Sequence, residues 1–251
     1  MSGKLTGKTA VITGASRGLG EAMALALAAE GARIALVARD RERLDAVAAE
    51  IRAANGQAIA IRADVTSEDQ VRRIEREIAA QFGKVDILIN NAGVIVRKPI
   101  VEFTLEEWRR VMDTSVTGAF LMCRSFVPHM RGRGYGRILN MTSTMSRVSL
   151  PGRSAYSASK AALLGMTRAL ALELAGDGIT VNGISAGPFA TELNQSVIAD
   201  PEVNAQFLAN IPLGRWGRAE EIGQLAVYLC SEDAGFITGT DILIDGGWCA
   251  R

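Results

Sequence analysis

The sequence predicts a doubly wound α/β fold, in which a parallel sheet of about seven strands is flanked by helices. Short apolar runs alternate with longer helical patterns over all 251 residues. The apolar runs are rich in Val, Ile and Leu and show no clear alternation, as expected of strands buried on both faces of a parallel sheet. No linker, internal repeat or change of composition divides the chain. We therefore expect one domain that spans residues 1–251.

The expected strands are short and follow one another at intervals that leave room for a helix. They cover residues 9–13, 33–38, 58–62, 87–90, 137–141, 180–184 and 242–244. One helical pattern lies in each gap, and these patterns begin near Gly18, Arg41, Ser67, Leu105, Ser154 and Ala219. Regular alternation of this kind is typical of a parallel sheet that binds ligands beyond the carboxyl ends of its strands.

One long segment interrupts the alternation directly after the sixth expected strand. Residues 187–216 carry three prolines and no long helical pattern. Because this segment starts at the carboxyl end of a strand, we expect it to cover a bound substrate. A passive excursion over the surface is the alternative.

Composition narrows the class of partner. The chain has 28 Lys and Arg against 27 Asp and Glu, a formal net charge of +1, and therefore no general field that attracts nucleic acid or an anionic membrane. Its three cysteines and single histidine lack the spacing of a metal site or a disulfide framework. We expect a small-molecule ligand and no metal.

The first residues and the hydropathy pattern bear on location. Residues 1–8 lead straight into the first expected strand without the apolar core of a signal peptide. No apolar run approaches the ~20 residues of a membrane span. We expect a cytoplasmic protein.

A glycine-rich turn follows the first expected strand. Gly14, Gly18 and Gly20 allow the backbone to turn sharply and to approach a pyrophosphate, and the helix that follows offers free N–H groups. The pattern is TGxxxGxG rather than GxGxxG. The turn predicts a dinucleotide site whose cofactor-binding residues are Gly14, Ser16, Arg17, Gly18, Leu19 and Gly20.

The end of the second expected strand bears on the choice of dinucleotide. An acidic residue here would accept hydrogen bonds from the adenosine ribose, but the sequence has Arg39, and Arg17 lies in the glycine turn. Two guanidinium groups near the ribose suit a 2′-phosphate, so we expect NADP(H) to be preferred and NAD(H) to be possible. The alternative is that Arg39 and Asp40 only begin a solvated helix.

Tyr156 and Lys160 share one face of an expected helix, four residues apart. Lowering the pKa of a tyrosine from ~10 by roughly three units requires about 4 kcal/mol of preferential stabilisation of the phenolate. A neighbouring ammonium group supplies part of that stabilisation. The pair predicts a proton-transfer site, although this spacing also occurs by chance on solvated helices.

Taken together, these ordered motifs resemble the short-chain dehydrogenase/reductase family over essentially the whole chain. The resemblance implies a Rossmann-like fold, a nicotinamide cofactor and, by analogy at residues 245–248, a homotetramer. It implies that Tyr156 is the acid or base, that Lys160 lowers its pKa and holds the nicotinamide ribose, and that Ser143 orients the substrate oxygen. The remaining cofactor-binding residues that it implies are Asp64, Val65, Asn91, Ala92, Gly93, Gly187, Phe189 and Thr191.

Ser115 is the point at which the chain departs from the family pattern. The family usually has an asparagine there, which holds a water behind the lysine. A serine has a shorter reach but still forms hydrogen bonds. We expect Ser115 to take the fourth catalytic position, and the proton relay is the step that this substitution affects.

The substrate is narrowed only in part by the resemblance. Residues 91–97, 211–217 and 245–251 are similar to bacterial gluconate and deoxygluconate dehydrogenases, which act on a sugar acid. A carboxylate needs a cation, and Arg97, Arg147 and Arg153 lie near the catalytic elements in sequence. We expect interconversion of a secondary alcohol and a ketone on a sugar acid or related polyol. The alternatives are a 3-oxoacyl carrier-protein reductase and an NADPH-binding regulatory module with little turnover.

Overall fold

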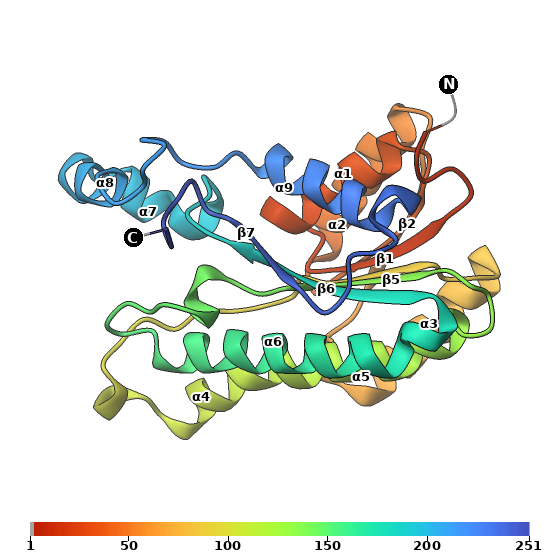
Figure 1. Cartoon of the computed structure of the whole chain (residues 1–251), viewed down its shortest axis with the longest axis horizontal. Helices are drawn as coiled ribbons and strands as arrows, with labels where there is room; N and C mark the ends of the chain where they lie inside the picture. The colour runs from red at the N-terminus through yellow and green to blue at the C-terminus, as the bar shows by residue number, and fades with distance from the viewer. Residues whose placement is uncertain (1–2, 251) are drawn as a thin grey trace.

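A parallel sheet of seven strands forms the centre of the molecule, in the order β3-β2-β1-β4-β5-β6-β7 (Figure 1). The computed structural model describes residues 3–250. Its strands are β1 (Thr9–Thr13), β2 (Arg33–Ala38), β3 (Gln57–Arg62), β4 (Ile87–Asn90), β5 (Gly136–Met141), β6 (Ile179–Ala186) and β7 (Asp241–Ile244). The order reverses between β1 and β4, so the connections leave a crevice beyond the carboxyl ends of these two strands.

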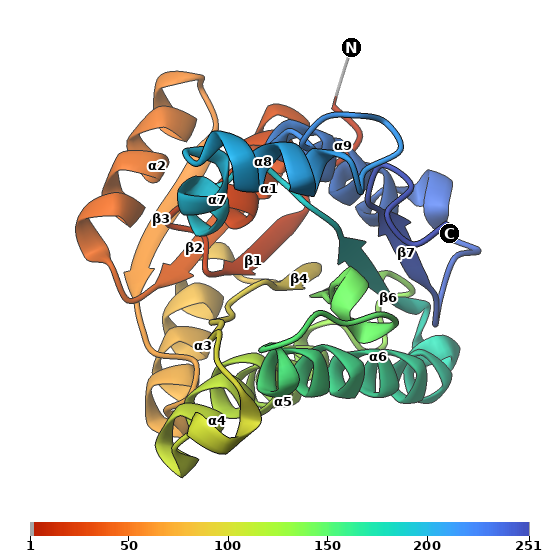
Figure 2. The same cartoon turned by 90° about the vertical axis from the view of Figure 1, so that its left-hand side faces the viewer.

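Helices cover both faces of the sheet (Figures 1 and 2). One face carries α1 (Gly18–Ala29), α2 (Arg41–Ala53) and α9 (Ala219–Cys230). The other carries α3 (Glu68–Phe82), α4 (Leu105–Met112), α5 (Gly118–Phe126) and α6 (Ser154–Leu174). Within residues 3–250, no helix is long and apolar enough to cross a bilayer.

The expected fold class is confirmed, and each strand appears within two residues of its expected bounds. Two helices begin where polar side chains cap them: the Asp40 carboxylate accepts from Arg43 N, and the Ser67 hydroxyl accepts from Gln70 N. The segment 187–216 is less irregular than expected, because it contains α7 (Gln195–Ile198) and α8 (Pro201–Leu208). Figure 2 views the molecule from the side on which these two helices lie.

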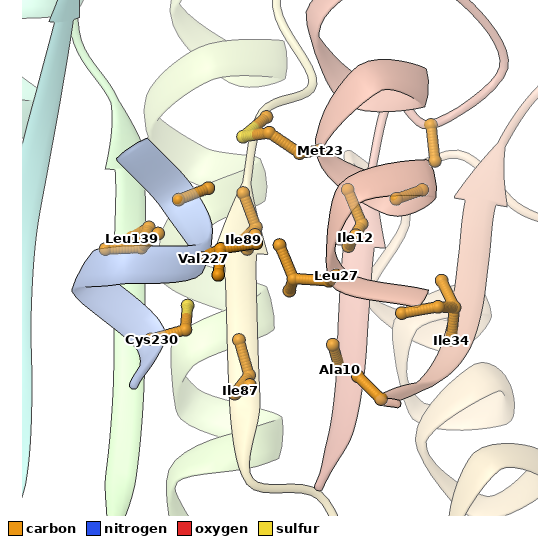
Figure 3. Packing of buried hydrophobic residues seen from close by; sticks show 14 of the residues in the cluster. Ala10, Ile12, Met23, Leu27, Ile34, Ile87, Ile89, Leu139, Val227 and Cys230 are labelled. Carbon is orange, nitrogen blue, oxygen red and sulfur yellow. The ribbon is translucent and has the colours of Figure 1, made fainter. Parts of the chain in front are cut away.

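Apolar side chains fill both faces of the sheet, which explains why the strands show no alternation. Figure 3 shows Ile12 and Ile89 packed beneath Met23 and Leu27 of α1, with Val227 of α9 beside them. The opposite side chains of the same strands form a second cluster against α3, α5 and α6; they include Val11, Leu88 and Ile138. Burial on both faces holds the strand ends, and the loops that follow them, in fixed positions.

Helices α1 and α9 pack closely because α9 has a glycine at the contact. A Cβ atom on Gly223 would lie 2.8 Å from Ala26 Cβ and 2.9 Å from Ala22 O, so any side chain there forces the helices apart. This contact fixes α1, whose N-terminus faces the crevice.

Candidate functional site

A cleft of about 910 Å³ opens beyond the carboxyl ends of the strands. The loops after β1 to β6 all contribute to its wall, and Trp248 adds a side chain from beyond β7. Every catalytic and cofactor-binding residue expected from the sequence lines this cleft except Gly20 and Ser115. The parallel sheet therefore brings together residues that lie far apart in the chain.

The glycine turn has the backbone shape that the sequence pattern requires. Gly14 and Gly18 have φ values of 64° and 61°, which residues other than glycine rarely adopt. A Cβ on Gly20 would lie 2.3 Å from Gly14 O, so only glycine fits there. Arg17 is the N-cap residue of α1 and makes no side-chain capping bond, so its side chain does not compete with an anion for the N–H groups at the start of the helix.

Asn91 braces the turn from the end of β4. Its side-chain amide donates to Thr13 O and Gly14 O, both at 3.0 Å. The Thr13 hydroxyl in turn accepts from the backbone of Asn91 and Ala92, each at 3.0 Å. Asn91 therefore acts on the shape of the cleft through the glycine turn.

Asp64 and Val65, two of the predicted cofactor-binding residues, line the cleft directly after β3. The Asp64 carboxylate accepts from Thr66 N at 2.9 Å and from the Thr66 hydroxyl at 2.8 Å, which fixes the turn after the strand. Asp64 N donates to Gln70 Oε1 at 3.0 Å. Val65 is buried beside it, where it contributes an apolar wall.

The two arginines expected near the adenosine ribose behave differently. Arg39 is exposed at the end of β2 and lines the cleft. Arg17 also lines it, but its Nη1 forms an ion pair with Glu192 Oε2 at 2.8 Å. Arg43 of α2 binds the same carboxylate, with Nη1 2.8 Å from Oε1.

Lys160 lies deep in the cleft wall. Its side chain is 4% exposed, and Nζ donates to Met141 O at 2.6 Å, which holds it at the end of β5. The same Nζ lies 5.4 Å from the centroid of the Tyr156 ring. Burial lowers the pKa of Lys160 from 10.5 to about 8, so the amine remains mostly charged at neutral pH.

Tyr156 and Ser143 meet beside this lysine. Burial raises the pKa of the Tyr156 phenol, while a hydrogen bond with Ser143 and the positive charges of Arg153 and Arg97 act in the opposite direction. The Ser143 hydroxyl also accepts from Met145 N at 3.2 Å and lies 3.4 Å from Ala186 O. With these protein groups alone, the phenol stays protonated at neutral pH.

Ser115 lies behind the lysine in a π-helical turn, η2 (Asp113–Thr117), between α4 and α5. The residue is 1% exposed, and its Oγ has no hydrogen-bond partner in the described part of the chain. A Cβ on Gly93 would lie 3.6 Å from both Ser115 Oγ and Lys160 Nζ, so both groups flank one glycine. The π turn separates α4 from α5, and such turns often mark functional positions.

The loop after β6 closes the other end of the cleft. Gly187 N donates to Ile244 O at 3.0 Å, and Phe189 is 3% exposed and pairs with Gly217 through an isolated β-bridge. Phe189 O accepts from Thr191 N at 2.9 Å and from the Asn194 amide at 3.0 Å. Thr191 itself lines the cleft near the glycine turn.

The three arginines considered for a carboxylate separate into two groups. Arg147 is bound to β7, because its Nε lies 3.2 Å from Asp241 Oδ2 and its Nη2 donates to Asp241 O at 3.0 Å. Arg97 and Arg153 line the cleft instead. Arg153 Nη1 is buried without a hydrogen-bond partner among residues 3–250, and burial, with Arg97 nearby, lowers the Arg153 pKa.

Sequence reasoning missed several residues at this site. Glu192 and Arg43 belong to no sequence motif. Glu192 lies on an irregular segment and Arg43 in the first turn of a helix, and a single charge in either place gives no periodic pattern. Phe207 and Trp248 line the cleft, with their rings stacked at 5.0 Å between centroids. The aromatic residues in 187–216 and 245–248 were a signal that could have suggested this contact.

The chain matches a known protein family over almost its whole length. Residues 14–249 match the family model described as "Enoyl-(Acyl carrier protein) reductase". The chain is a short-chain dehydrogenase/reductase. It is therefore an oxidoreductase of a family that acts on CH–OH groups and binds nicotinamide cofactors.

Relatives of this short-chain dehydrogenase/reductase include 3-oxoacyl-[acyl-carrier-protein] reductases and gluconate dehydrogenases. A 3-oxoacyl-[acyl-carrier-protein] reductase of Synechocystis is 39% identical over 245 residues, which cover 97% of each chain. Gluconate 5-dehydrogenase of Gluconobacter oxydans is 37% identical over 243 residues, with 97% of this chain and 95% of that protein covered. Among solved structures, a gluconate 5-dehydrogenase from Burkholderia cenocepacia, in complex with NADP and tartrate, has a TM-score of 0.94 at 34% identity and covers 98% and 97% of the two chains.

Proposed function

We propose that this short-chain dehydrogenase/reductase interconverts a secondary alcohol and a ketone on a sugar acid and prefers NADP(H). The observation that carries the substrate class is Arg153, a partly buried guanidinium whose Nη1 is buried and unpartnered among residues 3–250, in the wall of the cleft that Tyr156 also lines. A buried N–H group without an acceptor is costly, and a substrate carboxylate would relieve that cost. The gluconate 5-dehydrogenase relatives support the same substrate class.

The residues of the cleft fit a dinucleotide. The uncapped N-terminus of α1 and the open glycine turn suit the pyrophosphate, and Arg17 and Arg39 suit a 2′-phosphate. The neighbour that was solved with NADP supports this preference. When bound, the nicotinamide supplies a hydride to the ketone or accepts one from the alcohol.

The chain's own groups handle the proton. In the direction of reduction, the Tyr156 phenol donates its proton to the carbonyl oxygen as the carbon gains its hydrogen, and an alcohol and a phenolate result. The Lys160 ammonium, 5.4 Å from the ring, stabilises the phenolate, and Ser143 holds the reacting oxygen next to the phenol. Ser115 lies behind Lys160 as the group that we assign to the relay of protons to solvent.

The segment 187–216 completes the site as a cover in this proposal. Its helix α8 supplies Phe207, which stacks on Trp216 and on Trp248 at centroid distances of 5.1 and 5.0 Å. An aromatic wall of this kind suits the C–H face of a sugar, while Arg153 and Arg97 suit its carboxylate.

Replacing Tyr156 by Phe tests the chemistry. The variant keeps the ring but loses the acidic proton, so we expect kcat to fall by at least about 1,000-fold while NADPH binding changes less than twofold. The measurement is single-turnover kinetics alongside calorimetric titration of NADPH. Full activity in this variant would refute the role of Tyr156.

Replacing Arg153 by Gln tests the substrate class. In a turnover screen with both cofactors over sugar acids, polyols, diketones and oxoacyl thioesters, we expect the variant to raise KM for the sugar acid about 10- to 100-fold and to leave KM for uncharged polyols unchanged. Arg168→Gln, on the exposed side of α6, is the matched control. An equal loss for charged and uncharged substrates would contradict the proposal.

The second candidate is a 3-oxoacyl carrier-protein reductase, which the 39% identical relative favours. In that case, the acyl chain would enter along Phe207 and Trp248. Reduction of an acetoacetyl thioester with a higher kcat/KM than any sugar acid would select this function, and Arg153→Gln would then have little effect on it.

A further inference from the structure

Glu192 connects three parts of the cofactor cleft. It begins η6 (Glu192–Asn194), directly after the loop that follows β6. Its Oε2 lies 2.8 Å from Arg17 Nη1 in the glycine turn, and its Oε1 lies 2.8 Å from Arg43 Nη1 on α2. Arg43 Nη1 also lies 3.0 Å from Oε2. Two guanidinium groups from separate elements therefore converge on one carboxylate.

This cluster stands at the adenosine end of the cleft. Arg17, Arg39, Asp40 and Glu192 all line it. Asp40 is already engaged, because its carboxylate accepts from Arg43 N at 3.2 Å and lies 3.5 Å from Arg43 Nε. Hydrogen bonds from Arg43 and Arg17 hold the pKa of Glu192 below its ordinary value, so Glu192 is an ionised carboxylate at neutral pH.

We propose that Glu192 is a specificity-determining residue that competes with the 2′-phosphate of NADP(H) for Arg17 and Arg43. A phosphomonoester carries more charge and more acceptor oxygens than a carboxylate, so it takes over these donors at the expense of the Glu192 ion pairs. NAD(H) has no group that makes this exchange. Glu192 thus weakens the binding of the phosphorylated cofactor selectively. The inference rests on the proposed use of NADP(H).

Binding of two small nucleotides to the full-length protein isolates this effect. We use 2′,5′-ADP and 5′-AMP, which differ only by the 2′-phosphate, and measure both by calorimetry. We expect Glu192→Gln to tighten 2′,5′-ADP by about 3- to 10-fold and to change 5′-AMP by less than twofold. Glu202→Gln, an exposed acid at the start of α8, removes the same charge from the same segment and serves as the matched control.

A second pair of variants tests whether Glu192 acts by occupying Arg43. In an Arg43→Gln background, Glu192→Gln should gain less affinity for 2′,5′-ADP than it gains in the wild type, because one of the contested donors is gone. Equal gains in both backgrounds would remove Arg43 from the mechanism and overturn the proposal as stated.

The outcomes separate this inference from the proposed cofactor preference. Wild-type protein that binds the two nucleotides equally would refute the preference for NADP(H), yet a selective gain in Glu192→Gln would still support competition by Glu192. No gain in Glu192→Gln, the same gain for both nucleotides, or an equal gain in Glu202→Gln would overturn the role of Glu192.

Discussion

Lys160 illustrates how one buried charge in the cleft wall lowers stability. Its side chain is 4% exposed, and the hydrogen bond that it makes within residues 3–250 goes to Met141 O. The folded protein holds its pKa at about 8, against an ordinary lysine pKa of 10.5. The unfolded chain therefore binds the proton more tightly than the folded chain does. The resulting loss of folding free energy is complete below pH 8 and becomes smaller as the pH rises towards 10.5.

Replacing Lys160 by Met should reveal this penalty. At pH 7 we expect the free energy of unfolding to rise by about 1 to 3 kcal/mol, because the shift corresponds to roughly 3 kcal/mol and the lost bond to Met141 O offsets part of it. At about pH 10 the gain should shrink to below about 1 kcal/mol. Urea denaturation at both pH values measures it. A variant less stable than wild type at pH 7 would show that the lysine contributes net stability.

At the scale of elements, the loop that carries Ser143 is held at both ends by one residue of β7. The Asp241 carboxylate accepts from the Thr142 hydroxyl just before Ser143 and pairs with Arg147 just after η4 (Thr144–Ser146). The Asp241 side chain is 1% exposed. A strand at the edge of the sheet thereby positions a hydroxyl that follows β5, two strands away.

Asp241→Asn should loosen this loop without touching the cofactor. The amide keeps the size of the side chain but loses the charge that binds Arg147, so we expect a loss of about 1 to 2 kcal/mol in stability and about a 10-fold fall in kcat. NADPH affinity should stay within twofold. Asp233→Asn, which breaks an exposed pair with Lys4, is the control and should change neither kcat nor stability appreciably. An unchanged kcat in Asp241→Asn would remove its positioning role.

Some of these elements could be predicted from the sequence, and others could not. Strands buried on both faces and glycines with positive φ leave local signals, so β1 to β7 and the turn at Gly14 were found from pattern alone. The π turn at Ser115 has no local signal, whereas α8 begins with a local one that sequence reasoning missed: Asp200 caps the helix and Pro201 is its first residue. The ion pairs of Glu192 with Arg43 and of Asp241 with Arg147 join residues 149 and 94 positions apart, and such pairings have no signal in a single sequence.

At the scale of the whole molecule, we propose a homotetramer, as the resemblance of residues 245–248 suggested. These residues pack within the chain: a Cβ on Gly247 would lie 2.9 Å from Pro212 Cγ, and one on Gly246 would lie 2.8 Å from Ile211 Cγ2. Large apolar side chains elsewhere face outward; Phe236 and Leu172 are 104% and 84% exposed. Burial of such side chains between copies would stabilise an oligomer.

Sedimentation equilibrium tests the assembly. We expect a species with four times the 26.7 kDa mass of the chain. Phe236→Glu should shift the distribution towards smaller species, because a carboxylate is costly to bury between subunits. Wild-type protein that sediments as a single chain at micromolar concentration would refute the tetramer.

The one-sided arrangement of the loops also bears on engineering. The turn before β5 lies at the amino end of that strand, opposite the cleft, and a Cβ on Gly132 or Gly134 would meet no atom within 4 Å. Exposed turns with free space around them tolerate added sequence. A peptide tag or a reporter domain inserted after Gly132 would therefore sit across the sheet from Tyr156, where the protein can be immobilised or labelled while substrates reach the opposite edge.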